Sequence, residues 1–405
     1  MPFSATDTAH MHRALELARA TMGLASPNPQ VGCVIARENV VVGEGAHRYD
    51  LRDHAEVVAL KQAGDAAQGA TAYVTLEPCS HYGRTGPCAN ALLDAGVSRV
   101  IAATLDPNPL VAGKGMAILE QGGVVAEHGL LQREARALND AFARHILTGL
   151  PLVTLKSALS VDGMLAPLPI QRTSNAPFWL TGTAAREEVH RFRHASDAIL
   201  TGIGTILADD PVLTDRSNLQ RRRRLMRIVL DTSCRMPLSS RLVESANEDL
   251  IVFCGRSAPN DRQRALRQRG VTVEPLPTLT PAERGADAPA PQLDLRAVLK
   301  RLGEMDMLSV LVESGPGLNG AFLQAGLVDK AVLFFSETEL GEDAIPFADG
   351  GPSPFALIEQ LRDIDRCDFV SDLSNGARQV DACVRGTLHD PWAETFVLTP
   401  TSAAV

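Results

Sequence analysis

The chain has 405 residues, of which 45% are hydrophobic and 21% are charged, and its formal net charge at pH 7 is −9. This length predicts two or three soluble globular domains, and the negative charge gives no electrostatic case for binding a nucleic acid. No apolar run approaches the length of a membrane span or a signal peptide. The seven cysteines, spread from Cys33 to Cys383, are typical of a reducing compartment, so we expect a cytoplasmic protein with no membrane partner and no nucleic-acid partner.

The first 148 residues are expected to form one α/β domain. Apolar residues at helical spacing predict helices over 7–22, 55–63, 88–95, 115–121 and 131–146. Short apolar runs predict strands over 31–36, 40–45, 70–76, 99–104 and 124–127, the first two as a hairpin. Strands that alternate with helices favour a three-layer domain.

In this domain His54, Cys79 and Cys88 offer one imidazole and two thiols, which is a ligand set that a catalytic zinc prefers. Three protein ligands leave the fourth tetrahedral position open for water. Glu56 follows the histidine by two residues, too close to be a comfortable fourth ligand but well placed beside the metal. The pattern indicates a zinc deaminase, in which the metal activates water and an unligated Glu shuttles protons.

A closed structural zinc site is the alternative interpretation of these residues. It needs a fourth Cys or His, and His81, between the two cysteines, is the spare candidate. The His-x-Glu and Pro-Cys pairings favour the catalytic site.

Residues 149–151 read Gly-Leu-Pro and mark the predicted boundary with a second α/β domain over 149–405. We expect strands over 152–159, 198–202, 227–231, 250–254, 309–313 and 331–335, helices over 186–193, 263–269 and 321–324, and a surface loop over 275–291. The turn Gly315-Pro316-Gly317-Leu318-Asn319-Gly320 follows a strand and precedes a helix, which predicts a phosphate cradle in a nucleotide fold other than a Rossmann domain. The run Arg221-Arg222-Arg223-Arg224 is interpreted as a solvated loop, and Trp179, taken alone, as a core residue.

Together these motifs resemble the bifunctional deaminase–reductase family of riboflavin biosynthesis over nearly the whole chain. The stretches that carry the resemblance are 27–34, 54–56, 77–88, 106–109, 160–163, 196–213 and 312–323. The wide spacing of Cys79 and Cys88 is specific, because the tRNA adenosine and cytidine deaminases that share the zinc chemistry keep a shorter one. The resemblance implies an N-terminal cytidine-deaminase-like domain, 1–148, and a C-terminal domain similar to dihydrofolate reductase, 149–405.

The resemblance also implies two consecutive reactions. The first is zinc-dependent hydrolytic deamination of 2,5-diamino-6-(5-phosphoribosylamino)pyrimidin-4-one, and the second is NADPH-dependent reduction of the ribosyl group to ribityl. Carried over to this chain, His54, Cys79 and Cys88 would hold Zn²⁺, and Glu56 would be the proton shuttle. The residues expected to contact NADPH are Leu159, Trp179, Thr205, Asp209, Thr232, Gly315, Pro316, Gly317, Leu318, Asn319, Gly320 and Ala321. The residues expected to contact the phosphoribosyl substrate are Arg193, Leu213, Arg216 and Glu313.

The second half departs from the family at several positions. The residues Asn175-Ala176-Pro177-Phe178 stand where the family usually carries a Gly-Glu-Ser triplet, and proline offers neither a hydroxyl nor an N–H. Met164-Leu165-Ala166-Pro167 replaces basic, polar and small residues, and Ser314 replaces a glycine. One alternative is therefore a deaminase whose reductase-like domain is inactive or altered in substrate.

Two further alternatives belong to other functional classes. A nucleic-acid editing deaminase is disfavoured by the acidic net charge and by the wide cysteine spacing. A zinc-stabilised nucleotide-sensing or scaffold protein predicts a metal needed only for folding and no turnover. We expect a small-molecule substrate and leave open whether the chain forms a homo-oligomer.

Overall fold

The computed structural model describes residues 3–82, 86–168, 170, 178–279, 292–373 and 376–393, and the chain divides into two compact units. The first unit comprises Met1–Gly149 together with the short segments Gln220–Arg223 and Pro391–Glu394, and the second comprises the rest. The boundary predicted between 148 and 149 concerns functional domains and stays a prediction. In the described part of the chain no helix is both long enough and apolar enough to cross a membrane.

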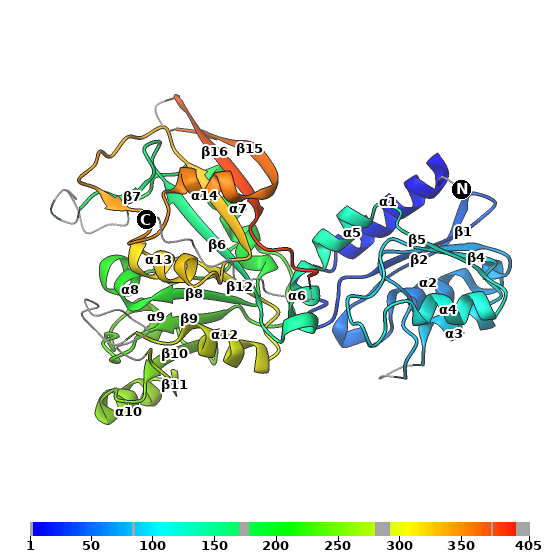
Figure 1. Ribbon diagram of the computed structural model, residues 1–405, viewed down its shortest axis with the longest axis horizontal. Helices are drawn as coiled ribbons and strands as arrows, with labels where there is room; N and C mark the ends of the chain where they lie inside the picture. The colour runs from blue at the N-terminus through cyan, green and yellow to red at the C-terminus, as the bar shows by residue number, and fades with distance from the viewer. Residues whose placement is uncertain are drawn as a thin grey trace, which may run out of the picture. The chain divides into compact units, whose positions relative to one another are not determined.

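The first unit is built on a five-stranded sheet with the strand order β2-β1-β3-β4-β5 (Figure 1). The strands are β1 (Gly32–Arg37), β2 (Val40–Ala46), β3 (Thr71–Val74), β4 (Arg99–Ala102) and β5 (Val125–His128). β1 pairs antiparallel with both β2 and β3, and β3, β4 and β5 run parallel. The predicted hairpin is confirmed.

Helices cover both faces of this sheet, which confirms the predicted three-layer domain (Figure 1). The helices are α1 (Ala5–Arg19), α2 (Ala55–Ala63), α3 (Cys88–Asp94), α4 (Lys114–Gln121), α5 (Gln132–Leu138) and α6 (Asp140–Thr148), with one-turn 3-10 helices at Tyr49–Leu51 and Gly64–Ala67. One core joins α1 and α5 to the sheet, and another joins α2, α3 and α4 to the opposite face.

The prediction of one helix over 131–146 is wrong, because the chain breaks it at Asn139. There the backbone leaves the helical region with φ −117°, and α5 ends while α6 begins. The Asn139 side chain accepts a hydrogen bond from the Gln30 N–H at 2.7 Å and donates one to the Gln30 carbonyl at 3.0 Å. An amide that can satisfy a distant backbone segment favours a helix end over a helix interior.

Helix α2 lies unusually close to β2, and a glycine makes this approach possible. A Cβ on Gly45 would stand 2.0 Å from the carbonyl oxygen of Ala55, the first residue of α2. No side chain fits in that space, so the glycine fixes how near the start of α2 lies to the sheet. His54 and Glu56 are therefore held at this helix start by backbone packing.

The second unit is built on a nine-stranded sheet with the order β11-β10-β9-β8-β12-β6-β13-β16-β15. The strands are β6 (Leu152–Leu159), β8 (Ala198–Gly202), β9 (Met226–Leu230), β10 (Leu250–Gly255), β11 (Thr272–Leu276), β12 (Ser309–Val312), β13 (Lys330–Phe335), β15 (Arg362–Asp372) and β16 (Arg378–Thr387). The strands from β11 to β13 run parallel, and β16 and β15 add an antiparallel edge. A separate small sheet pairs β7 (Met164–Ala166) with β14 (Ile345–Pro346).

Helices pack on both faces of this larger sheet as well. They are α7 (Thr183–Ala195), α8 (Ile203–Asp209), α9 (Arg241–Glu244), α10 (Asn260–Gln268), α12 (Leu295–Glu304), α13 (Pro316–Gln324) and α14 (Pro354–Gln360). The largest core joins α12, α13 and α14 to one face, while α8, α9 and α10 share a core on the other. α13 begins at Pro316, five residues before the predicted start, because Gly315 is already its N-cap.

Three predictions for the second half are corrected by the structure. The loop expected over 275–291 starts too early, because β11 continues through Leu276; residues 280–291 lie outside the described part. Trp179 is not a core residue, since its side chain is 60% exposed beside the Arg186 guanidinium, which lies 5.1 Å from the ring centroid. The arginine run is not a solvated loop: only Arg224 is exposed, and the other three arginines are half-buried in the first unit.

Candidate active sites

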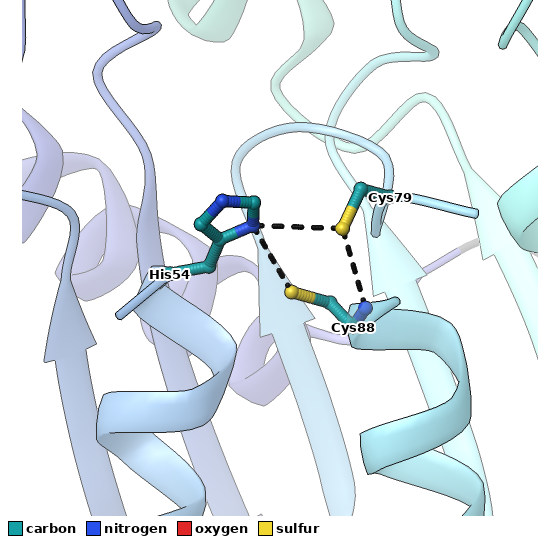
Figure 2. A group of neighbouring side chains, drawn as sticks. All are labelled: His54, Cys79 and Cys88. Atoms are coloured by element: carbon teal, nitrogen blue, oxygen red, sulfur yellow. Dashed lines mark hydrogen bonds between the residues drawn. The ribbon is translucent and has the colours of Figure 1, made fainter. Parts of the chain in front are cut away.

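Three side chains that are far apart in the sequence meet at one end of the first unit's sheet. His54 caps the N-terminus of α2, Cys79 follows β3, and Cys88 is the first residue of α3. Figure 2 shows the His54 imidazole facing both thiols: its Nδ1 lies 3.5 Å from the Cys79 Sγ and 3.2 Å from the Cys88 Sγ. The three candidate ligand atoms all lie within 4.8 Å of one another. The structure therefore brings together the three residues predicted to bind zinc.

The surroundings of Cys79 favour its thiolate form. The hydrogen bond with the Cys88 thiol, together with those from His54 and the Cys88 backbone N–H, lowers the pKa of Cys79 to about 4 despite burial. The Cys88 N–H, which donates to the Cys79 Sγ at 3.2 Å, is the first amide of α3. Thiolates are the form in which cysteine ligates metal ions.

Glu56 lies beside this cluster but outside it. Only 3% of the residue is exposed, and burial, followed by the nearby charge of Cys79, raises the pKa of Glu56 to about 7. Within the described residues, the cluster of candidate ligands contains neither Glu56 nor His81, the spare ligand of the structural-zinc interpretation. In the described part of the chain the donors are thus an imidazole and two cysteine sulfurs with no fourth protein donor, which is an open donor set.

A cavity of about 410 Å³ gives access to this cluster. Its lining comprises Pro27, Asn28, Pro29, Val31, His47, Tyr49, Arg52, His54, Glu56, Leu76, Glu77, Cys79, His81, Asp106, Asn108, Val111, Phe142 and Ile146. His47 is a wall residue that sequence reasoning missed, and no sequence signal points to it. Its Nδ1 lies 2.9 Å from the Asp53 carbonyl, and its Nε2 lies 3.0 Å from the Asn28 amide nitrogen. This arrangement suits a neutral imidazole that donates from Nδ1 and accepts at Nε2, and burial lowers the pKa of His47 accordingly.

Glu77 organises the loop on the other side of the cavity. Its carboxylate is almost wholly buried and accepts hydrogen bonds from the backbone N–H groups of Asp106, Gly113, Gly115 and Met116. Two of these donors lie in the loop after β4 and two in the first turn of α4, so one buried carboxylate fixes the loop against the helix start. That loop carries Asp106 and Asn108 to the cavity wall.

The second unit contains a larger cavity of about 880 Å³, which lies in the range of small-molecule and cofactor sites. The predicted cofactor residues that line it are Trp179, Thr205, Asp209, Gly315, Pro316, Gly317 and Leu318. The four predicted substrate residues also line it: Arg193, Leu213, Arg216 and Glu313. The structure thus gathers eleven of the sixteen residues predicted for the second half around one cavity.

Five of the predicted cofactor residues do not line the cavity: Leu159, Thr232, Asn319, Gly320 and Ala321. Leu159 is fully buried in the core. The Asn319 side chain donates to the Phe347 carbonyl at 2.9 Å, and a Cβ on Gly320 would stand 2.1 Å from the Asp349 carbonyl oxygen. Asn319 and Gly320 thus pack α13 against the segment that contains Phe347 and Asp349. A cofactor role for all five residues stays a prediction.

A buried charge cluster forms one wall of the larger cavity. The Arg193 guanidinium pairs with Glu313 through two hydrogen bonds of 2.7 and 2.9 Å, and its third donor reaches the Thr214 carbonyl at 3.0 Å. Lys156 lies 3.9 Å from the same carboxylate. Although burial would raise it, these two cations lower the pKa of Glu313 to about 2. Lys156 lies within β6 and was not among the predicted site residues.

Comparison with known proteins identifies this two-unit architecture. Residues 151–368 match the family model of the RibD C-terminal domain, and residues 4–104 match that of the cytidine and deoxycytidylate deaminase zinc-binding region. The riboflavin biosynthesis protein RibD of Escherichia coli is 43% identical over 349 residues, which is 84% of this chain and 89% of that protein. RibD of Aquifex aeolicus is 38% identical over 83% of this chain and 88% of its own.

The chain belongs to the RibD family of riboflavin biosynthesis proteins. Two solved structures extend the likeness to the whole fold. Acinetobacter baumannii RibD matches with a TM-score of 0.75 at 36% identity, covering 95% of this chain and 99% of that one. A diaminohydroxyphosphoribosylaminopyrimidine deaminase/5-amino-6-(5-phosphoribosylamino)uracil reductase of Thermotoga maritima matches with a TM-score of 0.73 at 28% identity, covering 94% and 99%.

In a member of the RibD family, one chain carries two activities. The chain is a bifunctional enzyme of riboflavin biosynthesis, with a cytidine-deaminase-like domain followed by a RibD reductase domain. The open cluster of His54, Cys79 and Cys88 lies in the region matched by the deaminase model, and the larger cavity lies in the region matched by the reductase model.

Proposed function

We propose that this chain deaminates 2,5-diamino-6-(5-phosphoribosylamino)pyrimidin-4-one and then reduces the ribosyl group of the product to ribityl with NADPH. The observation that carries the proposal is the open cluster of an imidazole and two thiols beside a buried carboxylate, in a chain that also has a second, nucleotide-sized cavity. Each cavity has the side chains that one of the two reactions needs.

In the first unit, His54, Cys79 and Cys88 would hold Zn²⁺. The donor set fits this metal, because imidazole and thiolate are its usual ligands and Cys79 already has the low pKa of a ligating thiol. When bound, zinc supplies a Lewis acid that brings the pKa of a water near neutrality. His54 stands at the N-cap of α2, and its Nδ1 faces both sulfurs.

Glu56 would transfer the protons of the deamination. A carboxyl group with a pKa of about 7 can accept a proton and give it back at neutral pH, whereas an ordinary glutamate is too weak a base and rarely protonated. Glu56 follows His54 by two residues and lies beside the thiols in space, but it is not one of the candidate ligands in the described cluster, so its carboxyl group can serve the reaction. It would take a proton from water and deliver it to the departing amino group.

In the second unit, the cavity would hold NADPH along the start of α13. The backbone at Gly315, Gly317 and Leu318 lines the cavity, and a helix N-terminus attracts a phosphate group through its free N–H groups. When bound, NADPH supplies the hydride. The exposed ring of Trp179 would flank the cofactor, and Thr205 and Asp209 would lie along the opposite wall on α8.

Of the two arginines predicted to bind the phosphoribosyl group, Arg216 is the better phosphate ligand. All three guanidinium nitrogens of Arg193 already donate hydrogen bonds, two to Glu313 and one to the Thr214 carbonyl. Arg216 is exposed at the cavity rim, where its guanidinium can take up a phosphate. Arg193 would instead fix Glu313 and the segment that carries Arg216.

The alternative, a deaminase with an altered reductase domain, rests on residues 175–178. Asn175, Ala176 and Pro177 lie outside the described residues, while Phe178 lines the larger cavity. Lys156 and Arg193 both contact Glu313 on the cavity wall, and this charge cluster supports an active reductase. All seven cysteines are free thiols, which supports a reducing, cytoplasmic location.

The decisive experiment gives the purified protein the diamino substrate with and without NADPH, and follows ammonia and the NADPH absorbance separately. We expect ammonia in both cases and NADPH oxidation that follows deamination. Ammonia without NADPH oxidation would establish the alternative. The absence of both ammonia release and NADPH oxidation would refute the proposed function.

A further inference from the structure

The short segment Gln220–Arg223 belongs to the first compact unit, although it lies in the chain between α8 and β9 of the second. It contains most of the one basic run of the sequence, and the functions proposed so far leave that run unused. Three half-buried arginines in a loop are costly unless their guanidinium groups have partners. The partners of these arginines therefore show which part of the first unit the segment holds in place.

Arg222 contacts two separate parts of the first unit. Its backbone N–H donates to the Gly23 carbonyl at 2.8 Å, and its Nε donates to the Ser26 carbonyl at 3.3 Å. Its guanidinium lies 3.9 Å from the centroid of the Tyr49 ring and 3.7 Å from the Asp50 carboxylate. A planar guanidinium stacked on an aromatic face, with a carboxylate at its edge, is a geometry that arginine favours.

Arg223 adds a second contact to the same turn. One of its terminal nitrogens donates to the Ser26 hydroxyl at 2.7 Å. A hydrogen bond within the segment, from the Arg221 Nε to the Arg223 carbonyl at 2.7 Å, stabilises the loop that carries both side chains. Ser26 is thus held through its carbonyl by one arginine and through its hydroxyl by the next.

The groups that these arginines hold form a wall of the first unit's cavity. Tyr49 lines it, and so do the three residues that follow Ser26, Pro27-Asn28-Pro29. The Asn28 side chain in turn lies 3.0 Å from the His47 Nε2, and the His47 Nδ1 lies 2.9 Å from the carbonyl of Asp53, the residue before His54. A continuous set of contacts therefore runs from the arginine segment to Asp53, the residue before the N-cap of α2.

The arginines themselves do not reach the cavity. Neither Arg222 nor Arg223 is among its lining residues, whereas Arg52 is. The two arginines of the segment therefore act on the cavity wall and not on a bound substrate. Positioning of this kind matters because a displacement of about 1 Å in a substrate-binding wall can cost about a hundredfold in rate.

We propose that Arg222 and Arg223 are positioning residues of the deaminase site, which fix the Ser26–Pro29 turn and the Tyr49 ring that wall its substrate cavity. The inference rests on the proposed function of that cavity and adds two residues that the chain supplies from far beyond the deaminase region. The wall they fix binds substrate and holds no metal ligand. Their loss should therefore weaken substrate binding more than it slows the chemical step.

The test measures KM and kcat of ammonia release for the full-length variants Arg222→Ala, Arg223→Ala and the double variant. Arg224→Ala is the matched control, because it removes the same charge from the same run. The Arg224 side chain donates instead to the Asn247 carbonyl at 2.6 Å, in the second unit. Zinc content and NADPH oxidation, with the deaminated product supplied directly, report whether both units stay folded.

We expect the double variant to raise KM for the diamino substrate about tenfold, with kcat within about twofold of the wild type. Zinc content, NADPH oxidation and the Arg224→Ala kinetics should stay at wild-type values. An unchanged KM in the double variant would overturn the inference, and so would a loss of zinc together with kcat, which would mean a general structural role. A wild-type protein that releases no ammonia would overturn both the proposed function and this inference. A wild-type protein with normal kinetics, together with a double variant whose KM is unchanged, would overturn the inference alone.

Discussion

Replacing Glu77 by Gln should strongly destabilise the first unit, because the change keeps the size of the side chain but removes its charge. The Glu77 carboxylate is 4% exposed. One oxygen accepts from the N–H groups of Gly115 and Met116 at 2.8 and 3.4 Å. The other accepts from those of Asp106 and Gly113 at 3.1 and 2.9 Å.

The magnitude follows from what a glutamine amide can offer in this place. Its carbonyl oxygen can accept on one side, but its NH₂ group would point donors at the two N–H groups on the other. Leaving a buried N–H without an acceptor costs about 1–3 kcal/mol, so two such groups predict a loss of about 4 kcal/mol in the free energy of unfolding. This is a large share of the stability of a typical domain.

The assay uses the two tryptophans of the chain, which report on different units. Trp392 belongs to the first unit, where its Nε1 donates to Asp140 at 2.8 Å, and Trp179 belongs to the second. Urea unfolding followed by Trp392 fluorescence in a Trp179→Phe background therefore measures the first unit. The control is Glu127→Gln, the same chemical change at a partly exposed carboxylate that pairs with Arg99 at 2.7 Å and should cost about 1 kcal/mol or less.

A Glu77→Gln variant no less stable than Glu127→Gln would refute the reasoning. It would mean that the loop before α4 and the start of α4 are held by their own packing and not by the buried carboxylate.

The remaining predictions concern the helix start, the buried ion pair and the phosphate. Gly45→Ala should lower ammonia release about a hundredfold, because its Cβ would stand 2.0 Å from the Ala55 carbonyl oxygen and displace the start of α2; kinetics equal to the wild type would contradict this. The pKa of Glu313 is about 2 in the folded protein and 4.5 in the free residue. This difference corresponds to about 3 kcal/mol of folding stability. That stability is present above pH 4.5 and is lost as the pH falls toward 2. Hydrogen exchange of the β12 amides, corrected for intrinsic rates, should show this loss, and Glu313→Gln should abolish its pH dependence; an equal pH dependence in both proteins would count against it. Arg216→Ala should raise KM of the reductase step about tenfold or more with ammonia release unchanged, and a normal KM would remove Arg216 from the phosphate site.

Residue types and spacing predicted much of the fold and of the candidate sites. The period of apolar residues placed α2 at Ala55–Ala63, with the same bounds as in the structure, because a helix that packs on one face carries a regular apolar stripe. The ligand triad was visible because few residue types bind zinc. Lys156 and Glu313 share a wall because β6 and β12 are neighbouring parallel strands whose register pairs Leu155 with Val312, the residues just before them.

The features that sequence reasoning missed depend on contacts between distant segments. Nothing near Asn139 announces the helix break, because its cause is the backbone of Gln30, more than a hundred residues away. The strands β15 and β16 were missed because they carry polar residues on an exposed edge and lack a strong apolar pattern. The arginine run was misjudged for a similar reason: its partners, Ser26 and Tyr49, lie in the first fifty residues.

The central claim is an open zinc site served by one proton-transferring carboxylate, and Glu56→Gln tests it most directly. The measurement is zinc content and ammonia release from the diamino substrate, for the variant and the wild type side by side. The account predicts equal zinc in both proteins and ammonia release lowered by about a hundredfold to ten-thousandfold in the variant, since the ligands are untouched and only the proton carrier is gone. Full ammonia release from the zinc-loaded variant would contradict it.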